Sequence, residues 1–461
     1  MTPPHVSPPI TKAPPGSWAP AHRAMRRLVR PVEELLATEV ASGALLALTT
    51  LVALAWANSP YASSYHALWV TPLSLSIGDF TIGTTPRFVV DEVLMTLFFF
   101  VVGLEIRREL ARGELSEVRR AALPFAAAVG GMVVPALVFV VLNLGRSTAR
   151  GWGVPMATDI AFAVAALALL GPRVPPALRI LLLALAVIDD VGAIVVIGVF
   201  YTSGFSIAGL VAAGAGLAGI LVLQRLGVRR PLAYAGPAVV IWLGLHEAGV
   251  HATLAGVLVG LATPAVAWMP RETLARSVEQ LLDRVRGEGS LELSLSELES
   301  IGREAIAPVD ALQHSLHRVV AFGVMPLFAF ANAGVTLDGV SFAGDGAMLV
   351  LGIVGGLVVG KPVGIVLGCF VATRVGARLP SGVTWSGLWV IGAAGGIGFT
   401  MSLFVAELAL EGAAHDAAKA AVLAGSVLSA LVALGLGRML LRVAPDGRAQ
   451  TESEAEQSTS S

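Results

Sequence analysis

Two adjacent carboxylates, Asp189 and Asp190, lie in the middle of an apolar run from Ile180 to Tyr201. A helix rises ~1.5 Å per residue, so the pair would lie ~15 Å from either end of the run, near the centre of a ~30 Å hydrocarbon core. Charged side chains at that depth cost at least ~2.5 kcal/mol each and are usually functional. The alternative is a pair that caps two shorter soluble helices, but no turn residue precedes it and only Gly192 follows it closely. The run therefore predicts a membrane span with functional carboxylates at its centre.

The composition also indicates a membrane protein. Hydrophobic residues make up 55% of the chain and charged residues 14%, and the mean hydropathy is +0.78. Soluble globular proteins seldom have such values. The net charge of -1 says nothing about nucleic acid, but the sequence has no basic patch interleaved with aromatic residues, so we expect no nucleic-acid partner. The single cysteine, Cys369, excludes an intramolecular disulfide and a cysteine-based metal site. We expect an all-α polytopic membrane protein in a lipid bilayer, with no cofactor.

Twelve apolar segments are candidate transmembrane helices. They lie near residues 38–57, 88–105, 121–143, 152–170, 176–201, 205–224, 231–246, 249–264, 317–336, 346–373, 387–410 and 418–441. Residues 70–84, between the first two segments, alternate in polarity around Gly78 and Asp79. This pattern predicts a small surface β-hairpin.

The polar segments define the ends of the transmembrane domain. Residues 1–33 and 445–461 are predicted to be disordered tails, because few of their residues could join an apolar core. The domain between them, 34–444, contains a long loop at 265–316. Apolar residues at helical spacing within this loop predict a surface amphipathic helix.

The distribution of cations predicts the orientation. With twelve spans, the side that carries both termini receives most of the 31 Lys and Arg residues. The other side receives only Arg87, Arg146, Arg150 and Lys419. Because positive loops face the cytoplasm, both termini are predicted to be cytoplasmic. Lys361 belongs to neither side, since it lies inside an apolar segment, where a lysine needs an anion or must lose its proton.

Two spans are expected to be broken. The fourth carries Gly and Pro just ahead of Thr158 and Asp159, and the eleventh contains the sequence GAAGGIGFT. Such residues weaken a continuous helix, although glycines can also serve close helix packing. An offset of seven spans means that the two run in opposite directions. Helices 3–5 and 10–12 would then form inverted repeats with discontinuous, crossing helices, an arrangement typical of secondary transporters.

Several motifs together resemble the NhaA family of bacterial Na⁺/H⁺ antiporters. The matching stretches are VGLEIRREL (102–110), GGMVVPAL (130–137), ATDIAFA (157–163), LALAVIDDVGAI (183–194), GVHATLAGV (249–257), PLFAFANAGV (326–335), GKPVGI (360–365) and GIGFTMSLF (396–404). The inverted-repeat pattern is known from this same family, so the two indications are not independent.

The resemblance implies electrogenic, pH-regulated exchange of Na⁺ (or Li⁺) for H⁺ in a bacterial inner membrane, serving sodium and pH homeostasis. It implies a homodimer formed through the 70–84 hairpin. It also assigns the ion site to Asp190, Asp189, Asp159 and Thr158, with Lys361 compensating their charge. A last set, implied to take part in pH regulation, comprises Glu105, Arg108, Glu109, His251 and His314.

His251 and Gln313 qualify what the resemblance implies about pH regulation. A histidine in a sequence such as that around His251 is more often a packed helix residue than a proton carrier. Gln313 stands where the family pattern has a glutamate, so one regulatory carboxylate is missing from this chain.

Three other functions are compatible with membrane carboxylates. An intramembrane aspartyl protease would need a GxGD motif, which is absent from the sequence. A passive cation channel would need a repeated filter, and the inverted repeat with its buried lysine favours a carrier. A symporter for an organic anion would need a buried arginine cluster, which the apolar segments do not provide.

Overall fold

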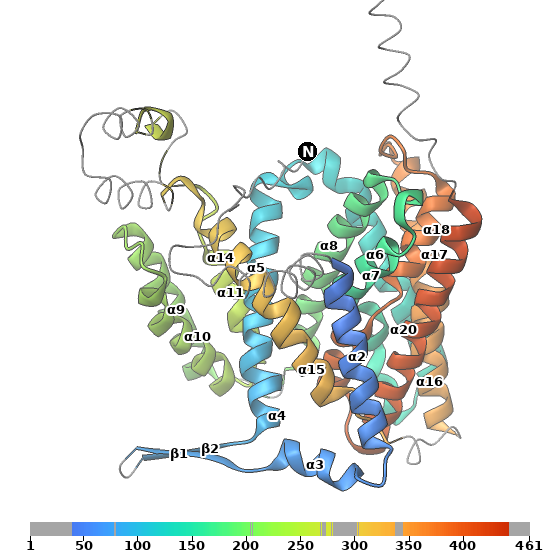
Figure 1. The fold of residues 1–461 in the computed structure, drawn as a ribbon, viewed down its shortest axis with the longest axis horizontal. Coiled ribbons are helices and arrows are strands. Elements are labelled where there is room, and N and C mark those ends of the chain that lie inside the picture. The colour runs from blue at the N-terminus through green and yellow to red at the C-terminus, as the bar shows by residue number, and fades with distance from the viewer. Residues whose placement is uncertain are drawn as a thin grey trace, which may run out of the picture.

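The computed structural model describes residues 39–77, 80–202, 204, 206–267, 269, 273–277, 279, 302, 304–336 and 344–441. Both predicted tails and most of the predicted amphipathic helix in the 265–316 loop lie outside these residues. The described part is a bundle of mostly upright helices (Figure 1), with two strands and the short helix α3 (Ala62–Val70) at one end. We call this end the hairpin end.

Among the described residues, seven helical runs are long and apolar enough to cross a membrane. Five are single α-helices, and the other two each consist of two α-helices joined by a short π-helical segment. They are α2 (Glu39–Ala57), α6 (Val118–Asn143), α8 (Pro176–Phe200), α9 (Ile207–Arg225), α14–η6–α15 (Pro308–Val319, Val320–Val324, Met325–Asn332), α16–η8–α17 (Asp345–Gly355, Gly356–Gly360, Lys361–Arg374) and α20 (Gly412–Leu440).

Two further spans are bent helix pairs, which confirms the prediction of two broken spans and gives up to nine spans in the described residues. The first consists of η3 (Ser147–Met156) and α7 (Ile160–Ala168), bent by 47°. The second consists of α18 (Trp385–Gly395) and α19 (Phe399–Ala409), bent by 49°. In the first pair the break follows Pro155, which has no backbone N–H to continue the helical ladder.

The other elements are shorter. The three that correspond to the remaining expected spans are α5 (Met95–Arg112), α10 (Ala235–Glu247) and α11 (Leu254–Ala262). The connecting turns are α4 (Pro86–Phe88), η1 (Val89–Leu94), η2 (Glu114–Ser116), η4 (Gly171–Arg173) and η5 (Pro231–Tyr234). The predicted hairpin is confirmed: β1 (Leu73–Ile77) pairs antiparallel with β2 (Phe80–Thr84), with Ile77 opposite Phe80.

Helices pack mainly within two groups. In the first, which we call the site group, α6, α8, η3 with α7, and α16 to α20 pack against one another. In the second, the α5 group, α5 packs against α11 and α14, while α10 links α9 to α11. Figure 1 shows the site group on the right and α9 and α10 at the left edge.

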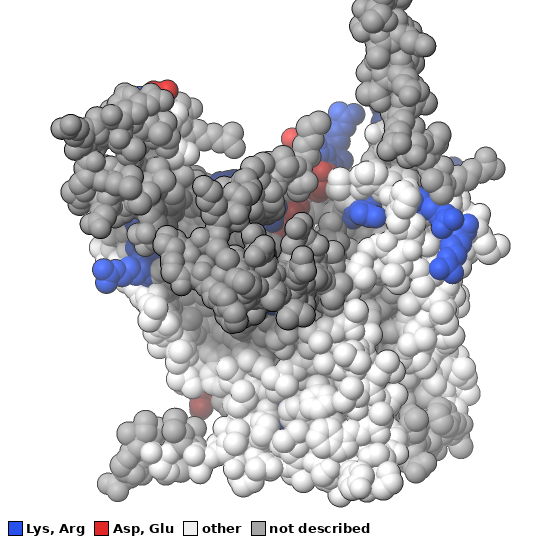
Figure 2. All heavy atoms as spheres, in the orientation of Figure 1, with Lys and Arg blue, Asp and Glu red and all other residues white. Residues whose placement is uncertain are grey.

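Charge is distributed unevenly along the bundle. Figure 2 shows the visible Lys and Arg side chains toward the end opposite the hairpin, whereas the described surface below them is almost entirely uncharged. Lys419 is 5% exposed in the first half of α20 (Gly412–Leu440).

The closest helix contact in the site group joins α6 to α17. A Cβ atom added at Gly364 would lie 2.1 Å from the carbonyl oxygen of Gly130. Since that oxygen belongs to the backbone, the helices could not keep this separation with any larger residue. Small residues thus hold Lys361, three residues before Gly364, close to α6.

We expect Gly364→Ala to lower the free energy of unfolding by ~1–3 kcal/mol, the usual cost of overpacking a tight contact. The measurement is thermal denaturation of the purified protein in detergent. Gly355→Ala in the same helical run is the control, because a Cβ there would meet only Val138 at 3.7 Å. Removing this helical glycine should be neutral or stabilising. Equal melting temperatures for both variants would contradict the tight contact.

Candidate functional site

The carboxylate pair lies on one uninterrupted helix. Helix α8 runs from Pro176 to Phe200 without a break, so the pair does not cap two shorter helices. Asp189 is 1% exposed and Asp190 is 6% exposed. Successive residues on a helix point ~100° apart, so the two carboxylates face different neighbouring residues.

Asp189 belongs to a fully buried polar cluster. Its Oδ2 accepts hydrogen bonds from Lys361 Nζ at 2.6 Å and from Thr158 Oγ1 at 2.5 Å. Lys361, which is 0% exposed, also donates to the carbonyl oxygen of Met156. Met156 ends the helix η3, where unpaired carbonyl groups leave a partial negative charge. The lysine therefore compensates both a carboxylate and a helix end.

The interruptions of the two bent spans meet. The amide of Asp159 donates to the carbonyl of Ile397 at 2.7 Å, and Thr158 Oγ1 lies 3.0 Å from the carbonyl oxygen of Gly395. Beside these contacts, Ser402 Oγ donates to the Val154 carbonyl at 2.8 Å. Backbone groups that the breaks release are thus satisfied by the opposite span, as buried backbone groups require.

Asp159 joins the two half-helices that begin at these breaks. As the N-cap of α7 it accepts from the Phe162 amide at 3.1 Å through Oδ1. Its Oδ2 accepts from the amide of Thr400 at 3.2 Å and from the Thr400 hydroxyl. Thr400 lies in the first turn of α19, so two positive helix ends face one carboxylate.

Asp190 differs from its neighbour. Its carboxylate makes no hydrogen bond or ion pair with any residue that the structure describes. Asp189 Oδ1 is buried and also lacks a hydrogen-bond partner. Buried acceptors are nearly always satisfied, so unpartnered oxygens inside a membrane protein indicate a place for a proton or a cation.

The structure brings some of the predicted site residues together and not others. Thr158 lies at Asp189, and Asp159 lies at Thr400. Within the described residues, no group of three or more His, Cys, Asp or Glu side chains is arranged to hold a metal ion. Two of the expected Na⁺ ligands, Thr158 and Asp159, thus already make hydrogen bonds inside the site group.

A polar cavity of about 700 Å³ lies between α5 and α14. Its lining residues are Arg108, Glu109, Arg112, Gly113, Asp310, Gln313, His314, His317 and Arg318. Arg108 Nη1 donates to Gln313 Oε1 at 3.1 Å, and Arg112 Nη1 lies 3.2 Å from Asp310 Oδ2. Most of the predicted regulatory residues thus share one cavity.

Two predicted regulatory residues lie outside this cavity. Glu105 is one turn before Glu109 on α5 and is half-buried. His251 lies between α10 and α11, with Nε2 2.9 Å from the carbonyl oxygen of Tyr201 at the end of α8. The structure therefore does not bring His251 to the α5–α14 cavity.

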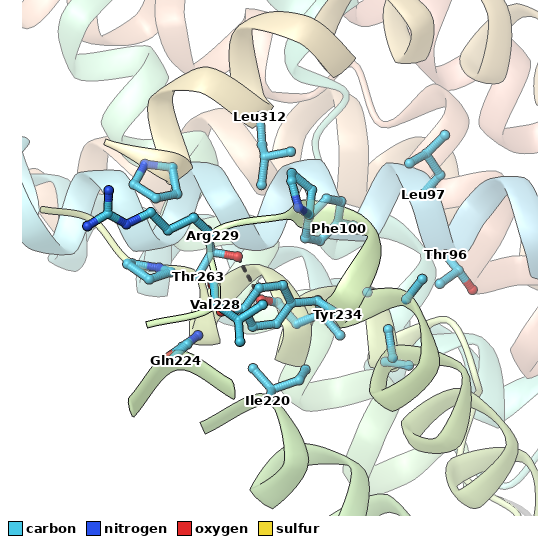
Figure 3. Close-up of a pocket in the computed structure, with 18 of the residues that line it drawn as sticks. Thr96, Leu97, Phe100, Ile220, Gln224, Val228, Arg229, Tyr234, Thr263 and Leu312 are labelled. Atoms are coloured by element: carbon cyan, nitrogen blue, oxygen red, sulfur yellow. Dashed lines mark hydrogen bonds between the residues drawn. The ribbon is translucent and has the colours of Figure 1, made fainter. Parts of the chain in front are cut away.

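An apolar cavity of about 390 Å³ lies beside α5, α9, α10 and α11 (Figure 3). Leu97, Phe100 and Ile220 face it, and the Tyr234 hydroxyl at its edge donates to the Val228 carbonyl at 2.6 Å. Its described lining contains no Asp, Glu or His side chain. It therefore offers no group that could exchange a proton for a cation.

Sequence reasoning missed two kinds of site partner. The Met156 carbonyl cannot be found from side-chain chemistry, because every residue has one. Thr400 lies in the matched GIGFTMSLF stretch, but the sequence gives no direct signal that it binds Asp159.

The chain is similar to known proteins over nearly its whole length. The family model described as Na⁺/H⁺ antiporter 1 matches residues 33–436. The chain is 52% identical over 461 residues to Na(+)/H(+) antiporter NhaA 2 of Sorangium cellulosum (strain So ce56), with 98% of each chain covered. It is 50% identical over 456 residues to Na(+)/H(+) antiporter NhaA 2 of Myxococcus xanthus (strain DK1622), with 97% of each covered. It is 44% identical over 435 residues to Na(+)/H(+) antiporter NhaA of Janthinobacterium sp. (strain Marseille), covering 92% of this chain and 96% of that protein.

Proposed function

Because this chain belongs to the Na⁺/H⁺ antiporter 1 family, we propose that Na⁺ and H⁺ compete for the carboxylates at the centre of α8. The protein is a transporter that exchanges Na⁺ for H⁺, not an enzyme. The observation that carries the proposal is the buried carboxylate of Asp190, which has no partner among the described residues, next to an Asp189 that is already paired with Lys361.

The competition follows from the charges at the site. Lys361 and Asp189 together are neutral, so an ionised Asp190 adds an uncompensated negative charge at the centre of the membrane. Such a charge is costly unless a cation or a proton neutralises it. Na⁺ prefers oxygen ligands, as other hard cations do, and Asp190 supplies two. Either ion therefore displaces the other, and exposure to each side in turn produces exchange.

Asp159 and Thr158 complete the proposed site. In the described state their oxygens bind Thr400 and Asp189, respectively. Both residues lie in the interruption between η3 and α7. We assign them as ligands that join Asp190 when Na⁺ binds, while Lys361 balances the charge of Asp189.

The test is proton release. Purified protein in weakly buffered detergent solution receives NaCl, with choline chloride as the control, and the pH is recorded from mildly acidic to mildly alkaline solution. The proposal predicts that Na⁺ releases protons and that its apparent affinity falls as the pH is lowered. Na⁺ binding without proton release at every pH would contradict the competition.

The proposed membrane topology has twelve spans. The seven long runs and two bent pairs account for nine, and α5, α10 and α11 supply the other three. We place η3–α7 and α18–α19 as the crossing helices of two inverted repeats. The concentration of Lys and Arg away from the hairpin end supports cytoplasmic termini in a bacterial inner membrane.

The exchange is proposed to export Na⁺ or Li⁺ electrogenically, for sodium and pH homeostasis. The hairpin formed by β1 and β2 projects sideways from the bundle in Figure 1, a position that suits pairing with a second copy. We therefore propose a homodimer through residues 70–84.

The α5–α14 cavity is the proposed site of pH regulation. It brings Arg108, Glu109 and His314 together, and we include Glu105 and the more distant His251. Gln313 cannot titrate, so this chain has one coupled group fewer, and fewer coupled groups give a broader response.

We expect Gln313→Glu to steepen the dependence of exchange on pH. The new carboxylate would lie beside Arg108, whose Nη1 now donates to Gln313. The measurement is the exchange rate and apparent Na⁺ affinity at half-unit pH steps. Gln313→Leu, which removes the hydrogen bond without adding a charge, is the control. Superimposable profiles for the wild-type protein and Gln313→Glu would show that this position does not set the pH response.

A further inference from the structure

A second cluster of charged side chains lies at the hairpin end of the bundle. At its centre is Glu407 of α19, whose two carboxylate oxygens lie 2.8 and 2.9 Å from Arg87 Nη2. Lys419 Nζ lies 3.4 Å from Oε2. His415 Nε2 lies 2.7 Å from the same oxygen, though not aligned as a hydrogen bond. We call these four residues the Glu407 cluster.

The ion pair between Arg87 and Glu407 joins the two helix groups. Arg87 lies in α4, which leads through η1 into α5, whereas Glu407, His415 and Lys419 all lie in the site group. Arg87 has a second acidic neighbour, Asp91 of η1, whose Oδ2 lies 3.4 Å from Arg87 Nε. Arg87 is therefore the one member of the cluster contributed by the other group.

An aromatic contact lies between this ion pair and the ion site. Thr400, Phe404 and Glu407 follow one another on α19 at spacings of four and three residues, which places them along one helix face. The Phe404 ring lies 5.3 Å from that of Phe99 on α5 and 6.2 Å from that of Phe328 on α15. All three rings are at most 2% exposed. Two layers, one aromatic and one ionic, thus separate the site from the hairpin end.

We infer that the Arg87–Glu407 ion pair is the latch of a gate that closes the hairpin end of the transport path. The inference rests on the proposed exchange at Asp190 and adds positioning residues that lie outside that site. Alternating access requires the site to open to the hairpin end in part of each cycle. Because Arg87 and Glu407 belong to different helix groups along that route, the pair must separate when the gate opens.

The remaining cluster explains how the latch can open. When Arg87 withdraws, Glu407 still has Lys419 and His415 beside it, and Arg87 still has Asp91. Neither charge is left buried and unpaired, a situation that would otherwise be strongly unfavourable. The side chains of Arg87 and Glu407 are also 38% and 25% exposed, so water can solvate them as they part.

The test is a reversible covalent bridge. Cys369 is the only cysteine in the chain and is buried, so Cys369→Ser gives a background without reactive thiols. Arg87→Cys and Glu407→Cys are then joined by a flexible bis-methanethiosulfonate reagent in proteoliposomes. The bridge is expected to stop Na⁺/H⁺ exchange, and reduction is expected to restore it. Undiminished exchange by the bridged protein would overturn the latch.

The chain offers a matched control at a pair confined to one group. Arg146, next to α6, lies 2.5 Å from Asp345 of α16, and the two side chains are 35% and 49% exposed. Arg146→Cys with Asp345→Cys should keep exchanging when bridged. Because the reduced proteins must exchange Na⁺ for the comparison to be made, failure of the latch is distinguishable from failure of the proposed exchange.

A second variant keeps the test independent of the double cysteine. Arg87→Gln removes the latch but leaves Glu407 with Lys419 and His415. Loss of one partly exposed ion pair should shift the gate about threefold to fivefold toward the open state. The apparent affinity for Na⁺ supplied from the hairpin side should rise by that factor, and Arg146→Gln should leave it unchanged. Equal affinities in wild-type protein and Arg87→Gln from both sides would overturn the inference.

Discussion

Asp190→Asn is expected to reduce Na⁺-dependent dissipation of a pH gradient to the rate of protein-free vesicles. Asparagine has nearly the same shape as aspartate, but it can neither bind a proton in exchange nor carry the negative charge that attracts Na⁺. The measurement is fluorescence quenching of a ΔpH dye in proteoliposomes after addition of NaCl. It is the largest functional effect we expect, because Asp190 is the carboxylate in the middle of α8 that makes no hydrogen bond or ion pair with a described residue.

The same variant should remain folded. Asp190 makes no hydrogen bond or ion pair with a described residue, so its neutralisation breaks none of the contacts that hold the bent spans together. Its melting temperature should equal or exceed that of the wild-type protein, since a buried uncompensated carboxylate is removed. Asp190→Glu, which retains a carboxylate, should retain part of the exchange. Normal exchange by folded Asp190→Asn would show that the transported ions bind elsewhere.

The features that sequence predicted well depend on local chemistry. The apolar run around the carboxylate pair forms one continuous helix, and the breaks occur at the Pro- and Gly-rich stretches. The hairpin follows from alternation of polarity over a few residues. In each case the signal lies within one element, so neighbouring residues suffice to specify it.

The features that sequence missed depend on residues far apart in the chain. Thr400 donates a hydrogen bond to Asp159, which lies 241 positions away in the sequence. Lys361 donates to the carbonyl of Met156, which lies 205 positions away. The sequence likewise gives no signal that Lys419 pairs with Glu407, because the two residues lie on different helices.

Lys361→Ala is expected to give the largest loss of stability. It leaves Asp189 and the end of η3 without their buried cation, and breaking a buried ion pair costs ~3–5 kcal/mol. The melting temperature in detergent measures this loss. Lys361→Ala combined with Asp189→Asn should recover part of it, because the uncompensated carboxylate is also removed.

Charge movement separates two roles of Lys361. If Lys361 has a structural role, the folded Lys361→Ala protein should still move charge, as recorded by a membrane-potential dye. If Lys361 carries a transported proton, the variant should exchange ions without charge movement. Unchanged stability together with unchanged charge movement would contradict both roles and the buried position of Lys361.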